Sequence, residues 1–187
     1  MQSQELLMLR AIDFAARKHR DQRRKDEEAS PYINHPISVA LLIAEVGGIT
    51  DVEVLSAAIL HDTVEDTKTT PQELEATFGS RIRKLVEEVT DNKALPKAKR
   101  KQLQIEHACQ LSADAVLIKL GDKIWNVLDV MHSPPADWNL QRRREYLDWA
   151  EAVVDNCPKV NARLEQHFRT VLAAGRGLLL STQNFLQ

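Results

Sequence analysis

Four side chains that can bind metals or transfer protons lie within residues 61–66 of this chain: His61, Asp62, Glu65 and Asp66. An apolar run over residues 52–60 precedes them and predicts a buried helix. A His and an Asp side by side at the end of such a helix are costly to desolvate without a partner. A first-row divalent metal would supply that partner, because imidazole and carboxylate together suit such ions. The two acids that follow could accept a proton from a metal-activated water, so the segment predicts a hydrolytic site.

Two residues elsewhere in the chain could complete a metal site. His35 stands directly before Pro36, where a helix is expected to begin, and Asp122 lies inside an otherwise apolar helical segment. A buried carboxylate is expensive unless it is paired or metal-bound. With His61 and Asp62, these residues would provide two nitrogen and two oxygen ligands. The competing interpretations are a helix cap or surface His for His35, and a Lys or helix-terminus partner for Asp122.

The elements that must position these residues are predicted to be helices. Nearly every segment has helical periodicity, and no stretch alternates as a strand would. At 187 residues the chain fits one domain, residues 1–187, and we predict an all-α, single-domain helical bundle. Thr50 with Glu53, and Thr70 with Glu73, have the spacing of capping boxes at helix starts. The expected helices cover about residues 6–16, 36–46, 52–60, 71–78, 81–90, 97–110, 113–131, 137–156 and 159–180.

Composition and charge exclude several classes of protein. The net charge of −2 lacks the basic footprint of a nucleic-acid-binding protein. There is no signal peptide, and the apolar runs fall short of the ~20 residues of a membrane span, which favours a cytoplasmic protein. The two cysteines, Cys109 and Cys157, are expected at the surface as free thiols in a reducing compartment. Basic clusters at 17–25, 97–101 and 142–144 are either solvated faces or contacts for a small polyanionic substrate.

Taken together, these motifs resemble a known family. An isolated His, then His-Asp, then a distant Asp is the pattern of the HD-domain phosphohydrolases, all-α metal enzymes. The similarity is greater to the RelA/SpoT-type alarmone hydrolases, and above all to their stand-alone small members, which include the metazoan SpoT homologues. It covers about residues 14–154, so a C-terminal helix and tail at 159–187 lie outside it. The motifs that carry the resemblance are Arg24-Lys25-Asp26, Tyr32-Ile33-Asn34-His35-Pro36, His61-Asp62-Thr63-Val64-Glu65-Asp66 and Asp122-Lys123-Ile124-Trp125-Asn126.

The resemblance implies an activity and roles for the motif residues. The activity is removal of the 3′-pyrophosphate from ppGpp or pppGpp, giving GDP or GTP and pyrophosphate. Glu65 and Asp66 would activate the attacking water, and Asn126 would orient substrate or water. If the helix through residue 61 continues, Glu65 lies on the face of His61 and Asp62. Because the chain stops where the hydrolase does, we expect no synthetase domain and constitutive breakdown. One Mn²⁺ ion would be held by His35, His61, Asp62 and Asp122.

Substrate contacts are also implied by the resemblance. Tyr32 would pack either beside the nucleotide or simply within its loop. The same chemistry on another nucleotide, such as the 2′-phosphate of NADPH, is an alternative, and so is a non-catalytic alarmone-binding module. Oligomeric state is not indicated. The implied substrate-binding residues are Arg24, Lys25, Lys97, Arg142 and Tyr146, of which Lys97 and Arg142 could equally belong to solvated faces.

Some residues depart from the family pattern or match none of its positions. Gly121 stands where Ala is common, and Trp125 where Tyr is common. Since Gly inside a helix costs ~1 kcal/mol relative to Ala, we expect Gly121 to relax the helix that carries Asp122. The basic residues expected to be solvated are Lys99, Lys101, Arg143 and Arg144. The histidines expected to have no ligand role are His19, His107, His132 and His167.

Overall fold

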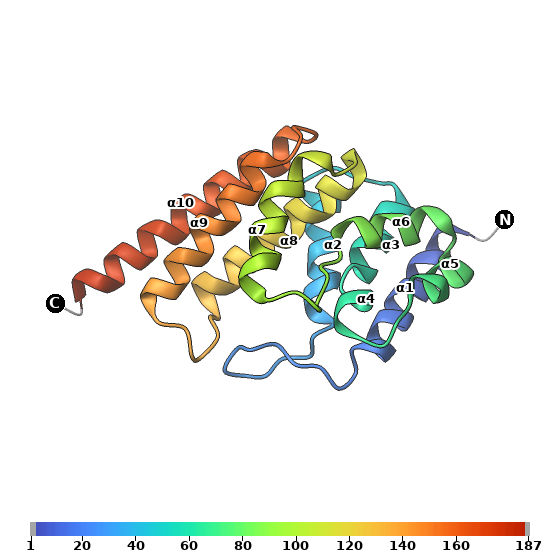
Figure 1. The fold of residues 1–187 in the computed structure, drawn as a ribbon, viewed down its shortest axis with the longest axis horizontal. Helices are drawn as coiled ribbons and strands as arrows, with labels where there is room; N and C mark the ends of the chain where they lie inside the picture. The colour runs from blue at the N-terminus through green and yellow to red at the C-terminus, as the bar shows by residue number, and fades with distance from the viewer. Residues whose placement is uncertain (1–2, 186–187) are drawn as a thin grey trace.

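The computed structural model describes residues 3–185, and in that range the predicted all-α, single-domain bundle is confirmed (Figure 1). Outside the helices, the described residues contain one isolated antiparallel bridge, between Arg23 and Pro31. None of the helices described is long and apolar enough to cross a membrane. The helices are α1 (Gln4–Lys18), α2 (Asn34–Glu45), α3 (Val52–Leu60), α4 (Thr63–Asp66), α5 (Pro71–Phe78), α6 (Ser80–Val89), α7 (Lys97–His107), the 3₁₀ turn η1 (Ala108–Gln110), α8 (Ala113–His132), α9 (Leu140–Asn156) and α10 (Ala162–Phe185).

Helix α8 is the centre of the fold because it is apolar on most of its circumference. It packs against α2, α6, α9 and α10, while α3 packs against α1, α2 and α6. Figure 1 shows α9 and α10 side by side along one edge of the molecule, with α1 and α5 at the opposite end. The site residues therefore come from helices that share one core, which fixes them relative to one another.

Helix α3 differs from the prediction in its capping residue, and α9 and α10 differ in their first residue. The cap of α3 is Asp51, whose carboxylate accepts from the backbone N–H groups of Glu53 and Val54, and not Thr50, which stands one residue too early. Helices α9 and α10 begin three residues later than expected, at Leu140 and Ala162. The oxygens of Asn139 and Asn161 accept the first free N–H groups there. The predicted cap of α5 by Thr70 is confirmed.

The sequence analysis considered a helix that continues through His61 to Glu65. The structure shows that this helix is interrupted. Helix α3 ends at Leu60, His61 and Asp62 form a turn, and α4 starts at Thr63. The hydroxyl of Thr63 donates to the carbonyl of Leu60 at 2.6 Å, which satisfies a carbonyl that the broken helix leaves free. The His-Asp pair therefore lies at a break between two helices.

Gly121 allows α8 to approach α2 closely. A Cβ at this position would lie 2.7 Å from Cγ1 of Ile43 and 3.1 Å from Cγ1 of Val39. Both side chains belong to α2 and are completely buried. The expectation that Gly121 relaxes its helix was wrong, since residues 113–132 form one helix and the glycine serves helix packing.

Candidate metal centre and cavity

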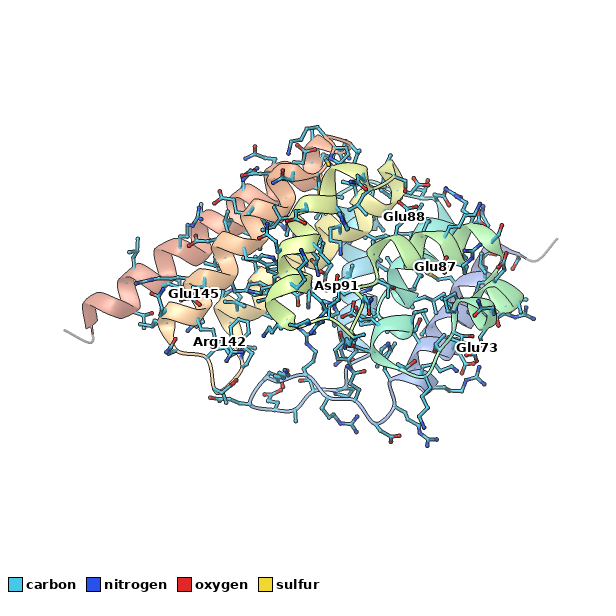
Figure 2. All side chains as sticks on the ribbon, viewed as in Figure 1. Glu73, Glu87, Glu88, Asp91, Arg142 and Glu145 are labelled. Atoms are coloured by element: carbon cyan, nitrogen blue, oxygen red, sulfur yellow. The ribbon has the colours of Figure 1, made fainter. Side chains whose placement is uncertain are left out.

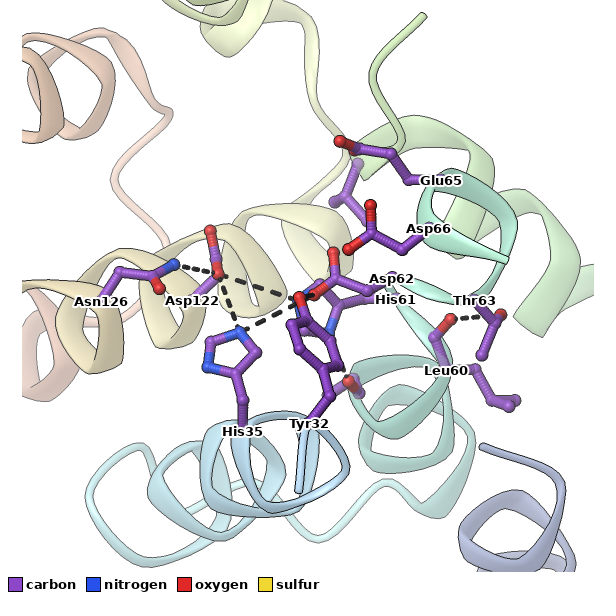
Figure 3. A network of polar contacts seen from close by, with 12 residues as sticks. Tyr32, His35, Leu60, His61, Asp62, Thr63, Glu65, Asp66, Asp122 and Asn126 are labelled. Carbon is purple, nitrogen blue, oxygen red and sulfur yellow. Dashed lines mark hydrogen bonds and ion pairs between the residues drawn. The ribbon is translucent and has the colours of Figure 1, made fainter. Parts of the chain in front are cut away.

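The structure brings the four predicted metal ligands together from three separate places in the chain. His35 comes from the first turn of α2, His61 and Asp62 from the break before α4, and Asp122 from the middle of α8 (Figure 3). Nε2 of His35 lies 3.3 Å from Oδ1 of Asp122, and Nε2 of His61 lies 3.1 Å from Oδ2 of Asp62. The crossed distances, from His35 to Asp62 and from His61 to Asp122, are both 3.8 Å. Ligand atoms of His35, His61 and Asp62 all lie within 4.8 Å of one another, and Asp122 approaches both histidines.

The hydrogen bonding of His61 shows that its second nitrogen suits a cation. Nδ1 lies 2.7 Å from the carbonyl oxygen of Ala58, which can only accept, so Nδ1 carries the proton. In a neutral ring the lone pair of Nε2 then points at the carboxylates of Asp62 and Asp122. Nε2 is buried and has no hydrogen-bond partner within the described structure. A lone pair facing two carboxylates is unfavourable unless a positive charge lies between them. That charge is a proton on Nε2 in the metal-free protein, and a divalent ion could take its place.

The electrostatics of the cluster favour a cation at the same place. Burial works against a charged imidazole, but the charge of Asp62 and the close approach of the Asp122 and Asp62 carboxylates raise the pKa of His61 to about 10. Burial lowers the pKa of His35. Burial alone would raise the pKa of Asp122, yet Lys123 and the two histidines hold it well below its usual range. Burial also opposes the charge of Asp62, but the neighbouring His61 lowers the pKa of this carboxyl. Both carboxylates therefore remain ionised and available as ligands.

A second layer of side chains orients the two carboxylates. The hydroxyl of Tyr32 donates to Oδ2 of Asp62 at 2.5 Å. The amide of Asn126 donates to Oδ1 of Asp122 at 2.6 Å, and Lys123 donates to Oδ2 at 3.0 Å. Tyr32, left undecided by the sequence, thus contacts a predicted ligand directly. Such partners fix the direction in which a ligand oxygen points.

Glu65 and Asp66 lie beside the cluster on α4 (Figure 3). One oxygen of Glu65 accepts from the backbone N–H of Asp91 at 2.9 Å. Asp66 accepts from the amide of Gln22 at 3.0 Å and pairs with Lys93. Burial raises the pKa of Glu65, a hydrogen bond from Asp91 opposes that change, and the charge of Asp62 adds to it. A carboxylate with a raised pKa is a better proton acceptor than an ordinary surface glutamate.

The cluster lies at the wall of a cavity of about 340 Å³. Lys97, Arg142 and Tyr146 line it, as does Glu65. A second cavity of about 290 Å³ adjoins it and contains Arg24 and Lys25. Both volumes together suit a ligand larger than a single phosphate. The residues that border both cavities are Tyr32, Asp66, Asn126, Trp138 and Tyr146.

The predicted substrate-binding residues differ in the contacts that their side chains already make within the protein. Arg24 is already engaged: it pairs with Asp129, lies 3.5 Å from Oδ1 of Asn126, and stacks over the ring of Tyr32. Lys25 is exposed. Tyr146 packs between two tryptophan rings, with its centroid 5.5 Å from Trp138 and 5.3 Å from Trp149. Arg142 stacks over Trp138 at 4.8 Å.

Three residues expected to be solvated are not. Lys101 lines the larger cavity, with its ammonium 4.6 Å from the ring centroid of Trp149. Its spacing of four residues from Lys97 placed both on one face of α7, a signal that sequence reasoning missed. Arg143 donates to the carbonyls of Val130 and Met131, where helix α8 ends. Arg144 donates to the carbonyl of Leu179, whereas Lys99 is exposed as expected.

Of the two cysteines predicted to lie at the surface, one is exposed and the other is buried. Cys109 is exposed as expected, but Cys157 is 5% exposed, so its assignment to the surface was wrong. Cys157 follows α9 directly and packs in the core. His19 is buried and bonds Gln22 at 2.7 Å. Sequence reasoning also passed over Arg100, which lies 3.6 Å from Glu65.

The fold and the cluster define the class of protein. The HD-domain family model matches residues 11–148, and the chain belongs to the HD-domain family. It is 51% identical, over 96% of its length and all of the relative, to guanosine-3′,5′-bis(diphosphate) 3′-pyrophosphohydrolase MESH1 of Homo sapiens. The protein of the same name from Xenopus tropicalis is 53% identical over 88% of this chain and 92% of the relative. A solved structure, described as a metazoan ortholog of SpoT that hydrolyzes ppGpp and plays a role in starvation responses, superposes with a TM-score of 0.89. It is 44% identical to this chain, and the match covers 95% of this chain and 98% of the solved one.

Proposed function

We propose that this protein hydrolyses ppGpp and pppGpp, releasing the 3′-pyrophosphate and leaving GDP or GTP. The observation that carries the proposal is the buried cluster of His35 and His61 with the carboxylates of Asp62 and Asp122, beside a cavity lined by several cationic side chains. The names of the similar proteins support the substrate. We also propose the cytoplasm as its location, which two unpaired cysteines support.

One divalent ion, which we propose to be Mn²⁺, would be held by His35, His61, Asp62 and Asp122. Bound there, it would act as a Lewis acid on a phosphoryl oxygen and lower the pKa of the attacking water. Tyr32 and Asn126 would stabilise this arrangement, because each donates a hydrogen bond that orients one ligand carboxylate.

The protons and the phosphates are handled by the chain's own side chains. Glu65 accepts the proton of the attacking water, for which its raised pKa suits it. Asp66 lies beside it and holds Gln22 and Lys93 in place. Asn126, bound to Asp122, orients the water or the substrate from the other side of the cluster.

The two adjoining cavities support a divided substrate site. Lys97 and Arg142 offset the charge of the phosphate groups in the larger cavity. Arg24 and Lys25 in the smaller one contact the guanine nucleotide, Arg24 through its flat guanidinium. Tyr146, at the border of both cavities, packs against the nucleoside.

The decisive experiment incubates the Mn²⁺-loaded protein with ppGpp, NADPH and a nucleotide panel, and separates the products by ion exchange. Release of pyrophosphate from ppGpp is the expected result. Phosphate release from NADPH would instead assign the site to that nucleotide. Tight ppGpp binding without turnover of any compound would make the protein a binding module and refute the enzyme proposal. Glu65→Ala should retain the metal and lose turnover, and full activity of this variant would refute its assigned role.

A further inference from the structure

The carboxylate of Glu65 is held mainly by residues outside its own helix. Helix α4 has four residues and no side-chain cap, so it offers little rigidity of its own. One oxygen of Glu65 accepts from the backbone N–H of Asp91 at 2.9 Å. The other oxygen lies 3.6 Å from Nη1 of Arg100. One oxygen is thus contacted from the segment after α6, and the other is contacted from α7.

Asp91 is itself fixed by neighbouring helices. Its Oδ2 accepts from the side-chain amide of Gln104 at 2.8 Å and lies 4.0 Å from Nη1 of Arg100. Two residues earlier, the carbonyl of Val89 accepts from the buried ammonium of Lys119 on α8 at 3.2 Å. Figure 2 shows Asp91 in the interior of the view, where the end of α6 meets α7. The backbone N–H that holds Glu65 therefore belongs to a braced segment.

Arg100 differs from the other cations near Glu65. Its guanidinium contacts the carboxylates of both Glu65 and Asp91, two like charges that would otherwise repel. Its side chain is 23% exposed, so solvent screens the contact only partly. Lys93 lies 3.8 Å from the same oxygen of Glu65, but it is 48% exposed and is bound to Asp66.

We propose that Arg100 and Asp91 are positioning residues, which fix the direction of the Glu65 carboxylate towards the attacking water. This proposal rests on the proposed function, in which Glu65 is the proton acceptor. Both residues line the larger cavity, and the proposed role of each is to hold Glu65 and not to bind substrate. A misplacement of about 1 Å at a reacting group can cost about 10²-fold in rate. Removing the contacts that hold Glu65 is therefore expected to lower kcat.

The first test is the steady-state kinetics of Arg100→Gln with ppGpp and Mn²⁺. We expect kcat to fall roughly 10- to 100-fold while KM changes by less than about twofold. Arg100→Lys should recover part of the loss, since it keeps the charge without the planar fork. Arg83→Gln is the matched control: Arg83 is 24% exposed and pairs with Glu75 and Glu87 outside the cavity, so its kcat should not change.

Two further measurements separate positioning from other roles. In a Glu65→Gln background, Arg100→Gln should cause no additional loss of kcat, because the group that it positions is already disabled. A crystal structure of Arg100→Gln should show the Glu65 carboxylate turned away from the Asp91 N–H. An increase in KM with unchanged kcat, an equal loss in both backgrounds, or an unmoved Glu65 would each overturn the proposal. If the unmodified protein fails to hydrolyse ppGpp, the proposed function falls, and the crystal structure still decides whether Arg100 orients Glu65.

Discussion

Gly121 and Gly177 allow the same substitution to be made at one crowded helical position and one open one. In Gly121→Ala the new Cβ would lie 2.7 Å from Cγ1 and 2.9 Å from Cδ1 of Ile43, and 3.1 Å from Cγ1 of Val39. In Gly177→Ala, on α10, the new Cβ would meet nothing within 4 Å. Helix propensity changes equally at both sites, so any difference between the variants reports the packing of α2 against α8.

The expected free energies follow from these contacts. Alanine in a helix is favoured over glycine by about 1 kcal/mol, and Gly177→Ala should gain roughly that amount. At residue 121 the same gain is opposed by an overpacking cost of about 1–3 kcal/mol, because Ile43 and Val39 are fully buried and stiff at χ1. Gly121→Ala should therefore lose up to about 2 kcal/mol and be about 1–3 kcal/mol less stable than Gly177→Ala. For a chain of this size each kcal/mol corresponds to roughly 2–4 °C in Tm.

The same displacement should reach the candidate metal centre. His35 is on α2 and Asp122 is next to Gly121 on α8, and their facing atoms are 3.3 Å apart. Pushing the two helices apart should weaken divalent-ion binding by about tenfold, the low end of the cost of disturbing ligand orientation. Gly177→Ala should bind the ion as the unmodified protein does.

Urea denaturation of the metal-free variants and calorimetric titration with Mn²⁺ measure the two effects separately. If Gly121→Ala is stabilised as much as Gly177→Ala, then α2 and α8 are not in the tight contact described, and the steric reasoning fails. If stability falls but ion affinity does not, the coupling between this contact and the metal ligands is refuted.

Three further outcomes are expected. Mn²⁺ at 100 times its Kd should stabilise the protein by about 2.7 kcal/mol in a thermal melt, and Asp62→Ala should abolish that shift; a retained shift would place the ion elsewhere. The acidic limb of the pH profile of kcat/KM should lie above the ordinary glutamate pKa of 4.5, because burial raises the pKa of Glu65 and only its deprotonated form accepts a proton; a limb at or below 4.5 would contradict this. In the native protein Cys109 should react with a thiol reagent well before Cys157, whose burial raises its pKa, and equal rates would contradict the buried assignment.

Local sequence patterns determined much of the fold because helices are built from local periodicity and caps. The all-α architecture and the cap of α5 by Thr70 followed from such patterns. The cap of α3 was predicted at Thr50 but is Asp51, because the cap depends on which residue adopts the extended backbone, and a spacing pattern does not show this.

The residue types of the site could also be named from the sequence. A His-Asp pair after a buried helix and a lone acid in an apolar segment are costly unless they meet a cation, and this argument requires no coordinates. The substrate needed the resemblance to a known family, since positive charge alone does not distinguish one polyanion from another.

Only the tertiary structure decided which side chains face one another. The structure showed that Nδ1 of His61 bonds the carbonyl of Ala58 and that Nε2 faces the carboxylates of Asp62 and Asp122. The contact of Arg100 with Glu65 joins helices α7 and α4, which residues 67–96 separate in the chain, and no local pattern records such a contact. Sequence fixes local conformation and the chemistry available, but orientation and shared burial depend on packing between distant segments, which only the fold supplies.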